Sequence, residues 1–242
     1  MQPVNNVMNF KQRSSELELM DLGPQHYSQT EYEDCLYKLN RVGTLLGGDR
    51  ASFHAFDRLP FQPRSILDIG CGGGFFTIKL AKRYPQTQVI GSDISTEAIT
   101  FAKKRLADQR NPLPNIEFLQ QKSPHIPDLP LEVDVITATL VCHHLSDDDL
   151  VTFLKDAFKK SNKSIIINDL HRHPLAYYSF LAISPLMFHN RLVLNDGPLS
   201  TLRAFKREDW IAYLQAANIP LNRCTITWHW AFRWIVCINT EK

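Results

Sequence analysis

Several features that identify particular protein classes are scarce in this sequence. It contains only 5 cysteines, an odd number, and no two of them have C-x-x-C spacing. Zinc modules and disulfide-stapled secreted domains both need closely spaced cysteines. The sequence therefore predicts neither a disulfide framework nor a metal site, and it favours a reducing, cytoplasmic location.

Charge and long apolar runs are equally modest. The formal net charge is +2 at pH 7, whereas proteins that bind a phosphate backbone usually carry a strong basic patch, so no nucleic-acid partner is expected. The longest apolar run, residues 175–188, is interrupted by Ser184-Pro185 and is too short to span a bilayer comfortably. The first residues also lack the pattern of a signal peptide. We expect no integral membrane segment, although residues 175–188 leave peripheral membrane contact open.

The remaining composition is that of a globular domain, with 44% hydrophobic residues. Residues 1–60 are expected to form an N-terminal helical extension, with a short helix near 15–21 and a longer one over 32–46. Apolar residues recur there at three- and four-residue steps and stop at Gly47-Gly48. From residue 61 to 242, short apolar runs alternate with amphipathic stretches, which is typical of βαβ units.

These runs predict a doubly wound α/β domain. The expected strands are residues 65–69, 88–92, 116–119, 133–138, 164–169, 224–228 and 232–238. The expected helices are residues 75–83, 96–106, 147–159 and 208–217. The last two strands are joined by only a few residues, which requires antiparallel pairing. The predicted sheet is therefore seven-stranded and mostly parallel, with one antiparallel strand.

Residues 170–206 form a long, aromatic connection without a regular period. A connection of this length is more often a functional lid than an idle loop. We expect an irregular lid over the acceptor site, with part of its aromatic set in the core. The aromatic candidates in the lid and the last hairpin are Tyr177, Tyr178, Phe180, Phe188, Trp228 and Trp230.

A glycine-rich turn follows the first predicted strand. Residues 68–74 read Asp-Ile-Gly-Cys-Gly-Gly-Gly and lead into a helix. Glycines allow a tight turn and close approach of a ligand, and the helix N-terminus offers free N–H groups. A dinucleotide loop would need a third glycine where Phe75 or Thr77 stands. The carboxylate of Asp68 would also repel a diphosphate.

This turn resembles motif I of the class I S-adenosylmethionine-dependent methyltransferases, whose cofactor carries an ammonium and a sulfonium group. Asp93 ends the second predicted strand about 20 residues beyond the turn, where a carboxylate can accept both ribose hydroxyls. Ile94 would then lie against the adenine ring. The resemblance implies S-adenosylmethionine as cofactor and a Rossmann-like methyltransferase fold.

The adenine end departs from the family pattern, because Lys122 stands where many relatives have an aspartate. Adenine recognition is therefore expected from backbone groups, Ser123 or Gln121. Thr139 and Leu140, at the end of the fourth strand, are similar to the small-molecule branch of the family, where this strand flanks the methionine moiety and the acceptor. The Asn/Asp-Pro-Pro-Tyr element of enzymes that methylate amides or nucleobases is missing.

The cofactor is expected to contact residues of the turn, the ends of the strands and the N-terminal extension. Arg13 is the candidate in the extension, where its guanidinium would hold the cofactor carboxylate with two hydrogen bonds. The complete expected set is Asp68, Gly70, Cys71, Gly72, Gly74, Asp93, Ile94, Lys122, Ser123, Thr139, Leu140 and Arg13.

Further stretches are similar to bacterial methyltransferases often encoded beside type III polyketide synthases: Arg13-Ser-Ser-Glu with Leu19-Met-Asp, Asn168-Asp-Leu-His-Arg, and Asp196-Gly-Pro-Leu-Ser with Arg203-Ala-Phe. The resemblance implies O-methylation of a small aromatic or polyketide-derived acceptor. C-methylation of a quinone or lipid precursor is the alternative within the enzyme class. A nicotinamide-dependent oxidoreductase, a non-catalytic cofactor-binding protein and a homodimeric state also remain open.

Histidines supply the candidate bases. A phenol has a pKa of about 10, so a base with a pKa of roughly 6–7 would assist methylation at neutral pH. His143 and His144 follow the fourth strand and His171 follows the fifth, at the edge of a parallel sheet where ligands bind. We expect His144 to be the base, followed by His171 and then His143. Arg172 is expected to pair with Asp169 rather than bind an acidic acceptor.

Overall fold

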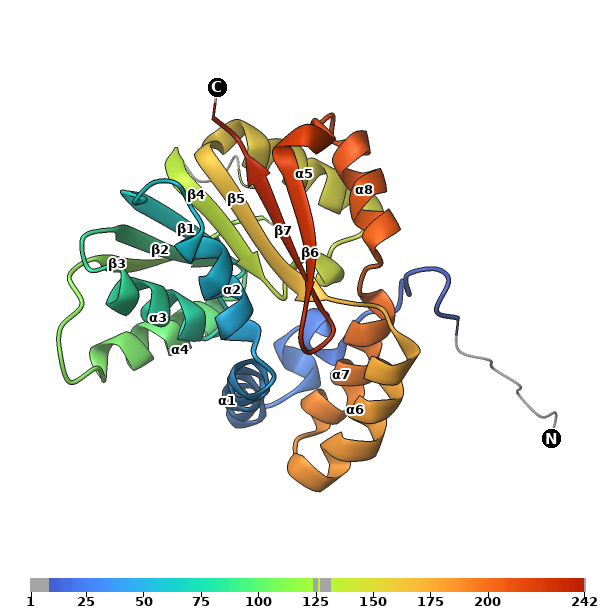
Figure 1. Cartoon of the computed structure of the whole chain (residues 1–242). Coiled ribbons are helices and arrows are strands. Elements are labelled where there is room, and N and C mark those ends of the chain that lie inside the picture. The colour runs from blue at the N-terminus through green and yellow to red at the C-terminus, as the bar shows by residue number, and fades with distance from the viewer. Residues whose placement is uncertain (1–8, 124–125, 127–131, 242) are drawn as a thin grey trace, which may run out of the picture.

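The computed structural model describes residues 9–123, 126 and 132–241. Its core is a twisted sheet with helices on both faces (Figure 1). The strands are β1 (Ser65–Ile69), β2 (Gln88–Asp93), β3 (Ile116–Gln120), β4 (Val133–Thr139), β5 (Ser161–Leu170), β6 (Cys224–His229) and β7 (Arg233–Asn239). They form one 7-stranded sheet in the order β3-β2-β1-β4-β5-β7-β6. Among these strands β7 alone runs opposite to all the others, so the predicted fold class is confirmed.

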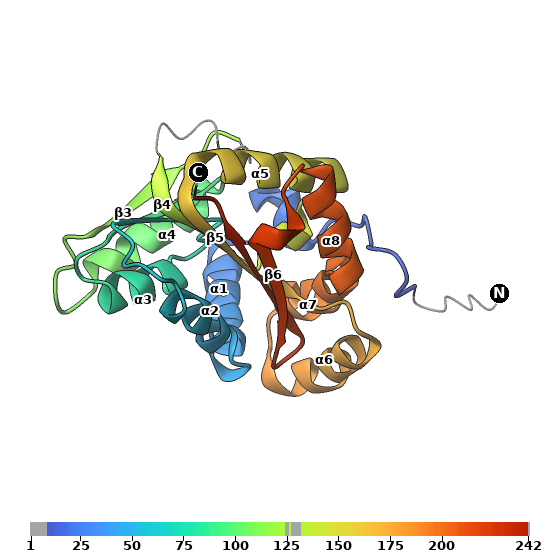
Figure 2. The same ribbon diagram turned by 45° about the horizontal axis from the view of Figure 1, so that its top comes forward.

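Helices cover the sheet in two layers and add a third group at one edge. They are α1 (Gln29–Leu45), α2 (Gly48–Asp57), α3 (Phe75–Arg83), α4 (Thr96–Ala107), α5 (Asp147–Lys160), α6 (Pro174–Met187), α7 (Arg191–Arg203) and α8 (Arg207–Ala216). Helices α2, α3 and α4 pack on one face of the sheet and α5 and α8 on the other (Figure 2). Within the described residues, no helix is long and apolar enough to cross a membrane.

The strands are apolar because both faces of the sheet are buried. In β5, Ile165 and Ile167 face α5 and α8, whereas Ile166 faces α2 and α3. A strand with two buried faces becomes a continuous apolar run rather than an alternating one. These continuous apolar runs are the reason why the strands can be predicted from the sequence.

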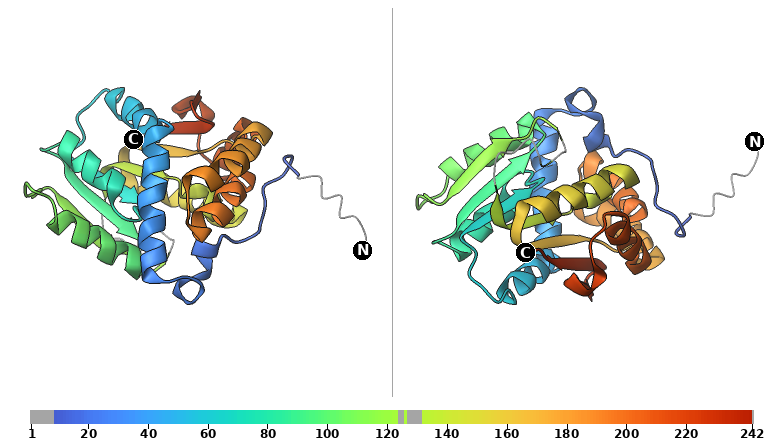
Figure 3. Two further views of the ribbon diagram at one scale, coloured as in Figure 1. Left: turned by 90° about the horizontal axis from the view of Figure 1, so that it is seen from below. Right: turned by 90° about the horizontal axis from the view of Figure 1, so that it is seen from above.

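Helix α1 and the pair α6 and α7 lie beyond the carboxyl ends of the parallel strands. Seen from below, α1 crosses beneath the sheet beside α6 and α7 (Figure 3, left). Helix α1 packs against α7, and α6 packs against α7. These three helices close the edge at which an α/β sheet binds its ligand.

The predicted stop at Gly47-Gly48 is confirmed, since α1 ends at Leu45 and Gly47 turns the chain with a φ of 74°. Helix α2, which begins at the next residue, was not predicted, and two predictions about the extension and the lid were wrong. Residues 15–18 are not helical, and only the 3₁₀ turn η1 (Leu19–Leu22) forms there. The lid is helical rather than irregular. Pro185 and Pro198 inside α6 and α7 interrupt the residue pattern that would have revealed these helices.

Candidate functional site

A cavity of about 1090 Å³ lies at the carboxyl edge of the sheet. Its walls come from the ends of β1, β2, β4 and β5, and its outer side is formed by η1, α1, α6 and α7. Residues near the start of β7 contribute as well, so the cavity extends across most of the sheet. A cavity in this position is large enough for a nucleoside and a second small molecule.

The glycine turn forms the floor of the cavity below β1. Gly70, Gly72 and Gly74 have φ values of 64°, 51° and 69°. A Cβ on Gly70 would lie 2.4 Å from Val141, and one on Gly74 would lie 2.5 Å from Phe118. On Gly72 the nearest atom would belong to Leu36, at 3.7 Å. Gly70 and Gly74 are therefore required by packing, whereas Gly72 exposes its backbone to a ligand.

Asp68 is a buried carboxylate on the same floor. Its Oδ2 accepts a hydrogen bond from Thr77 Oγ1 at 2.7 Å. Burial raises the pKa of Asp68 to about 7, because a desolvated carboxylate with few partners favours the neutral form. A bound cation would reverse this preference.

Asp93 stands at the end of β2 and contacts the glycine turn directly. Its Oδ2 accepts from the Gly72 N–H at 2.8 Å and its Oδ1 from the Ser95 N–H at 2.9 Å. Ser95 caps α4, since its Oγ accepts from the Ala98 N–H. Each carboxylate oxygen of Asp93 keeps accepting capacity for a ligand. Ile94 follows and is 56% exposed on the cavity wall.

Gln121 offers a polar group at the adjoining end of the cavity. Its Oε1 accepts from Ser92 Oγ at 3.1 Å, and its buried Nε2 has no hydrogen-bond partner among the described residues. A buried donor without a partner costs about 1–3 kcal/mol, so this amide is suited to a ligand. Lys122 and Ser123 do not line the cavity, and Lys122 is exposed. Of the three residues 121–123, Gln121 alone lines the cavity.

The end of β4 brings two more expected residues to the cavity. Thr139 has a buried Oγ1 without a partner in the described part of the chain. Leu140 adopts a φ of 58°, which is unusual for a leucine, and donates its backbone N–H to Asn168 O at 2.8 Å. Strained backbone of this kind is concentrated at ligand sites. Cys71, in the glycine turn, lines the cavity as well.

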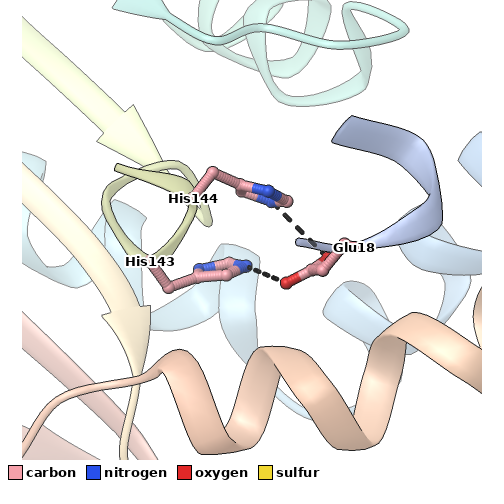
Figure 4. A group of neighbouring side chains, drawn as sticks. All are labelled: Glu18, His143 and His144. Carbon is pink, nitrogen blue, oxygen red and sulfur yellow. Dashed lines mark ion pairs between the residues drawn. The ribbon is translucent and has the colours of Figure 1, made fainter. Parts of the chain in front are cut away.

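His143 and His144 lie on the short 3₁₀ helix η4 (Cys142–His144), and each ring is held by a carboxylate. His143 Nδ1 is 2.7 Å from Asp169 Oδ1, and His144 Nδ1 is 2.8 Å from Asp21 Oδ1. The Nε2 atoms of both rings face Glu18, at 3.8 Å and 3.9 Å (Figure 4). These separations are too long for hydrogen bonds.

The surroundings of His144 oppose its expected role as a base. Burial disfavours the charged ring, but the bond to Asp21 and the charges of Glu18 and Asp21 outweigh it and raise the pKa of His144 to about 9. In the ligand-free protein the ring is therefore protonated at neutral pH. A protonated imidazole has no lone pair with which to accept a proton.

His171 is neutral but has the wrong tautomer for a base. Its Nδ1 accepts from Trp228 Nε1 at 3.2 Å, and an indole nitrogen can only donate. The neutral ring must then carry its hydrogen on Nε2. Burial lowers the pKa of His171 to about 4, so this state holds at neutral pH. His171, which lines the cavity, is therefore a hydrogen-bond donor rather than a proton acceptor.

The structure does not bring Arg13 to the cavity. Its guanidinium pairs with Asp147 at 2.7 Å, donates to the carbonyls of Leu145 and Arg203, and lies over the ring of Phe205. These contacts attach the N-terminal segment to the outside of the domain. The guanidinium is therefore occupied by the protein and cannot hold a cofactor carboxylate in this position.

The expected pair of Arg172 and Asp169 does not form. Arg172 is buried and pairs with Asp209 at 2.9 Å, while Asp169 is bound to His143. Among the aromatic candidates, Phe180, Phe188 and Trp230 line the cavity. The cavity wall does not include Tyr177, Tyr178 or Trp228.

Sequence reasoning missed Glu18, Arg203 and Arg233. Arg203 is buried and donates to the carbonyls of His143 and His144 at 2.9 Å and 2.7 Å, and also to the Glu16 carbonyl. Glu18 accepts from Ser200 Oγ at 2.9 Å and lies 3.9 Å from Arg203. The signal available in the sequence was an ionisable residue within otherwise apolar surroundings, as in Arg233-Trp-Ile-Val.

Arg233 is a buried cation without an acidic partner in contact. It is only 2% exposed, and its Nε and Nη1 have no hydrogen-bond partner within the described residues. Burial lowers its pKa, and the more distant charges of Asp169 and Asp49 partly oppose this effect. Those carboxylates are committed elsewhere, Asp169 to His143 and Asp49 to Lys79. The absence of a Cβ at Gly48 makes room for the guanidinium.

Comparison with known proteins agrees with this architecture. Residues 66–163 match the model of a family described as "Methyltransferase domain". A malonyl-[acyl-carrier protein] O-methyltransferase of Legionella pneumophila is 32% identical over 116 residues, which cover 48% of this chain and 37% of that protein. The matched region thus spans only about a third of that relative.

Solved structures show the same fold. The plantazolicin methyltransferase BpumL, in complex with a triazolic desmethylPZN analog and SAH, aligns with a TM-score of 0.68 at 16% identity, covering 91% of this chain and 93% of that one. An O-methyltransferase family 2 protein from Planctomyces limnophilus, in complex with apigenin, aligns with a TM-score of 0.63 at 17% identity over 88% of this chain and 62% of that one. The chain therefore contains a methyltransferase domain with the Rossmann-like fold, as predicted, and the SAH in BpumL agrees with the predicted cofactor.

The close contact of Gly70 with Val141 leads to a test of the turn. Gly70→Ala should lower the free energy of unfolding by about 2 kcal/mol or more, which is measured as a lower melting temperature. An alanine in the left-handed conformation and a steric clash both raise the energy of the folded state. The matched control is Gly43→Ala, at a helical position with nothing within 4 Å of the added Cβ, which should stabilise the protein slightly. Equal thermal stability of the two variants would contradict this account.

Proposed function

We propose that this chain is an S-adenosylmethionine-dependent O-methyltransferase that acts on an acidic oxygen of a small acceptor, in the first place a phenol of an aromatic or polyketide-derived molecule. The observation that carries the proposal is the distribution of buried charge in one cavity. Asp68 and Asp93 lie near the glycine turn. Arg233 lies near the far strands, and its Nε and Nη1 have no hydrogen-bond partner among the residues that the structure describes. Such a cavity suits a cationic nucleoside beside an anionic acceptor.

The residues around the turn fit the cofactor. Asp68 would bind the ammonium group, and Asp93 would accept the ribose hydroxyls while Gly72 lets the nucleoside approach. The free Nε2 of Gln121 would donate to a ring nitrogen of adenine, and Ile94 would cover the face of the ring. The remaining neighbours of the cofactor would be Cys71, Thr139 and Leu140. When bound, S-adenosylmethionine supplies an electrophilic methyl group on a sulfonium.

The far half of the cavity would hold the acceptor oxygen as an anion. Arg233 is already desolvated, so its guanidinium would pair strongly with a phenolate or carboxylate. The Nε2–H of His171 would add a second donor. Phe180, Phe188 and Trp230 would contact the apolar body of the acceptor and exclude water. Binding the acceptor as an anion removes the need for a base, and orientation toward the methyl group supplies much of the rate.

The comparisons support an oxygen acceptor from two directions. The Legionella relative is named for O-methylation of malonyl groups, which end in a carboxylate, and the Planctomyces structure holds apigenin, which is a phenol. The similarity to enzymes encoded beside type III polyketide synthases favours the phenol. Carboxyl O-methylation is the second candidate, because the fork of Arg233 matches a carboxylate that is ionised at neutral pH.

The direct test is methyl transfer to defined libraries. The protein with S-adenosylmethionine should convert a phenolic or polyketide acceptor to a product heavier by one methylene unit, with NMR placing the methyl group on oxygen. Transfer confined to carboxylic acids would select the second candidate. Products methylated on carbon, or binding of S-adenosylhomocysteine without any product, would refute the proposal.

Loss of the Asp93 charge should weaken cofactor binding. Asp93→Asn should reduce the affinity for S-adenosylhomocysteine more than about tenfold, since hydrogen bonds to a charged group contribute about 1.5–3 kcal/mol each. Asp108→Asn, at the exposed end of α4, is the control and should bind normally. Calorimetry checks both, and equal affinities would exclude Asp93 from the ribose site.

Asp68 should make cofactor binding depend on pH. Its carboxyl group has a pKa of about 7 in the ligand-free protein, so below pH 7 it must release a proton before it can bind an ammonium group. Affinity for S-adenosylhomocysteine should therefore fall as the pH is lowered below 7, by up to about tenfold per pH unit. Asp68→Asn should bind more weakly at pH 8 and lose the dependence. A wild-type affinity that is constant from pH 8 to pH 6 would count against this contact.

Replacement of Arg233 should weaken binding of the acceptor and at the same time increase the thermal stability of the protein. Arg233→Met should raise KM for an acidic acceptor more than about tenfold, because a charge-assisted pair is lost, and should leave S-adenosylhomocysteine affinity unchanged. The same variant should raise the melting temperature of the ligand-free protein, since it removes a buried charge that lacks a partner. Arg233→Lys retains the charge and should recover part of the KM effect. An unchanged KM would exclude contact with the acceptor.

A further inference from the structure

We infer that Glu18, His143 and His144 form a binding site for a divalent transition-metal ion in the wall of the cavity. Metal binding itself does not depend on the proposed function; only an effect of the ion on methyl transfer would rest on it. The sequence predicts no metal site, because Glu18 lies far from the two histidines along the chain and no local pattern joins them.

The spacing of the three side chains is better suited to coordination of an ion between them than to hydrogen bonds among them. Their ligand atoms all lie within 4.8 Å of one another. Both Nε2 atoms face the carboxylate of Glu18, yet no pair is close enough for a hydrogen bond (Figure 4). Nitrogen and oxygen ligands of zinc lie about 2.0–2.2 Å from the metal, and therefore roughly 3.3–3.6 Å from one another in tetrahedral geometry. The two histidine–glutamate distances would have to shorten by a few tenths of an ångström to hold an ion.

Each histidine is also supported in the way that metal ligands usually are. Asp169 binds Nδ1 of His143 at 2.7 Å, and Asp21 binds Nδ1 of His144 at 2.8 Å. When Nδ1–H donates to a carboxylate, the neutral ring presents the lone pair of Nε2 on its opposite side. Carboxylates in this second position orient metal-binding histidines and increase their basicity. Here both rings present Nε2 toward the same carboxylate.

The local charge favours a divalent cation. The carboxylates of Glu18, Asp21 and Asp169 surround the two rings, and the guanidinium of Arg203 lies 3.9 Å from both Glu18 and Asp21. With neutral rings, three negative charges face one positive charge. A divalent ion would neutralise the remaining two charges.

The site would leave a coordination position open toward the acceptor. Glu18, His143 and His144 all line the cavity, and three protein ligands on a zinc-type ion leave at least one position for another molecule. Imidazole and carboxylate ligands suit Zn²⁺, Fe²⁺ or Co²⁺ better than Mg²⁺. A water molecule or another oxygen ligand in the cavity is the natural fourth ligand for such an ion.

The experiment uses Co²⁺ as a spectroscopic probe for Zn²⁺. The full chain is freed of metal with a chelator, and binding of Co²⁺ and Zn²⁺ is followed by calorimetry and visible absorption. One ion should bind per chain with a dissociation constant below the micromolar range, and Co²⁺ should show ligand-field bands. Glu18→Gln and His144→Ala should each weaken binding more than about 100-fold, and Asp21→Asn, which removes no ligand, about 10–100-fold.

The control is His54→Ala, an exposed histidine on α2, which should bind the ion normally. Circular dichroism of each metal-free variant establishes that it is folded. Absence of Co²⁺ binding to the wild type, or binding unchanged by Glu18→Gln in a folded sample, would overturn the inference. S-adenosylhomocysteine affinity is measured on the same samples. Normal affinity without metal binding would refute the site alone, and metal binding without methyl transfer to any acceptor would refute the proposed function alone.

Discussion

Buried charge at the carboxyl edge of the sheet is the constraint on which the rest of this structure depends. A charged side chain removed from water destabilises the fold unless a partner compensates it. Asp68 has only a threonine hydroxyl, and the Nε and Nη1 of Arg233 have no hydrogen-bond partner in the described part of the chain. The ligand-free protein is therefore incompletely compensated. A cationic group near β1 would compensate Asp68, and an anionic group near β7 would compensate Arg233. The cavity is therefore suited to bind one ligand of each charge.

A different set of polar and charged groups holds the outer wall of the cavity together. Arg203 on α7 binds the carbonyls of η4, and Asp196 on the same helix accepts from the backbone N–H groups of Leu19 and Met20. Asn190, which caps α7, donates to Glu31 O on α1. The N-terminal segment, α1 and α7 are thus joined by polar contacts rather than by packing alone. These joined segments form the outer wall of the cavity.

The sequence was informative where a local pattern has a local cause. Strands buried on both faces must be apolar, and the glycine turn must bend tightly after β1, so both could be predicted from neighbouring residues. The same reasoning failed for α6 and α7, because Pro185 and Pro198 interrupt helices that are stabilised by contacts with distant elements. It also failed for charge pairs. Arg13 and Asp147 are 134 residues apart, and Arg172 takes Asp209 instead of the nearby Asp169. No local pattern specifies such partners.

The histidines show why a residue type in the right place does not establish its role. His143, His144 and His171 all lie at the ligand-binding edge, and a sequence can predict no more than that. The function of each ring depends on which of its nitrogens is already bonded. The Nδ1 atoms of His143 and His144 are hydrogen-bonded to carboxylates. The Nδ1 of His171 accepts a hydrogen bond from an indole N–H. Two rings therefore direct Nε2 toward Glu18, and the third offers a donor. This arrangement leaves none of the three rings as a base, so the proposed phenolic acceptor would have to be made acidic by positive charge beside its oxygen. The cavity wall carries such a charge at Arg233.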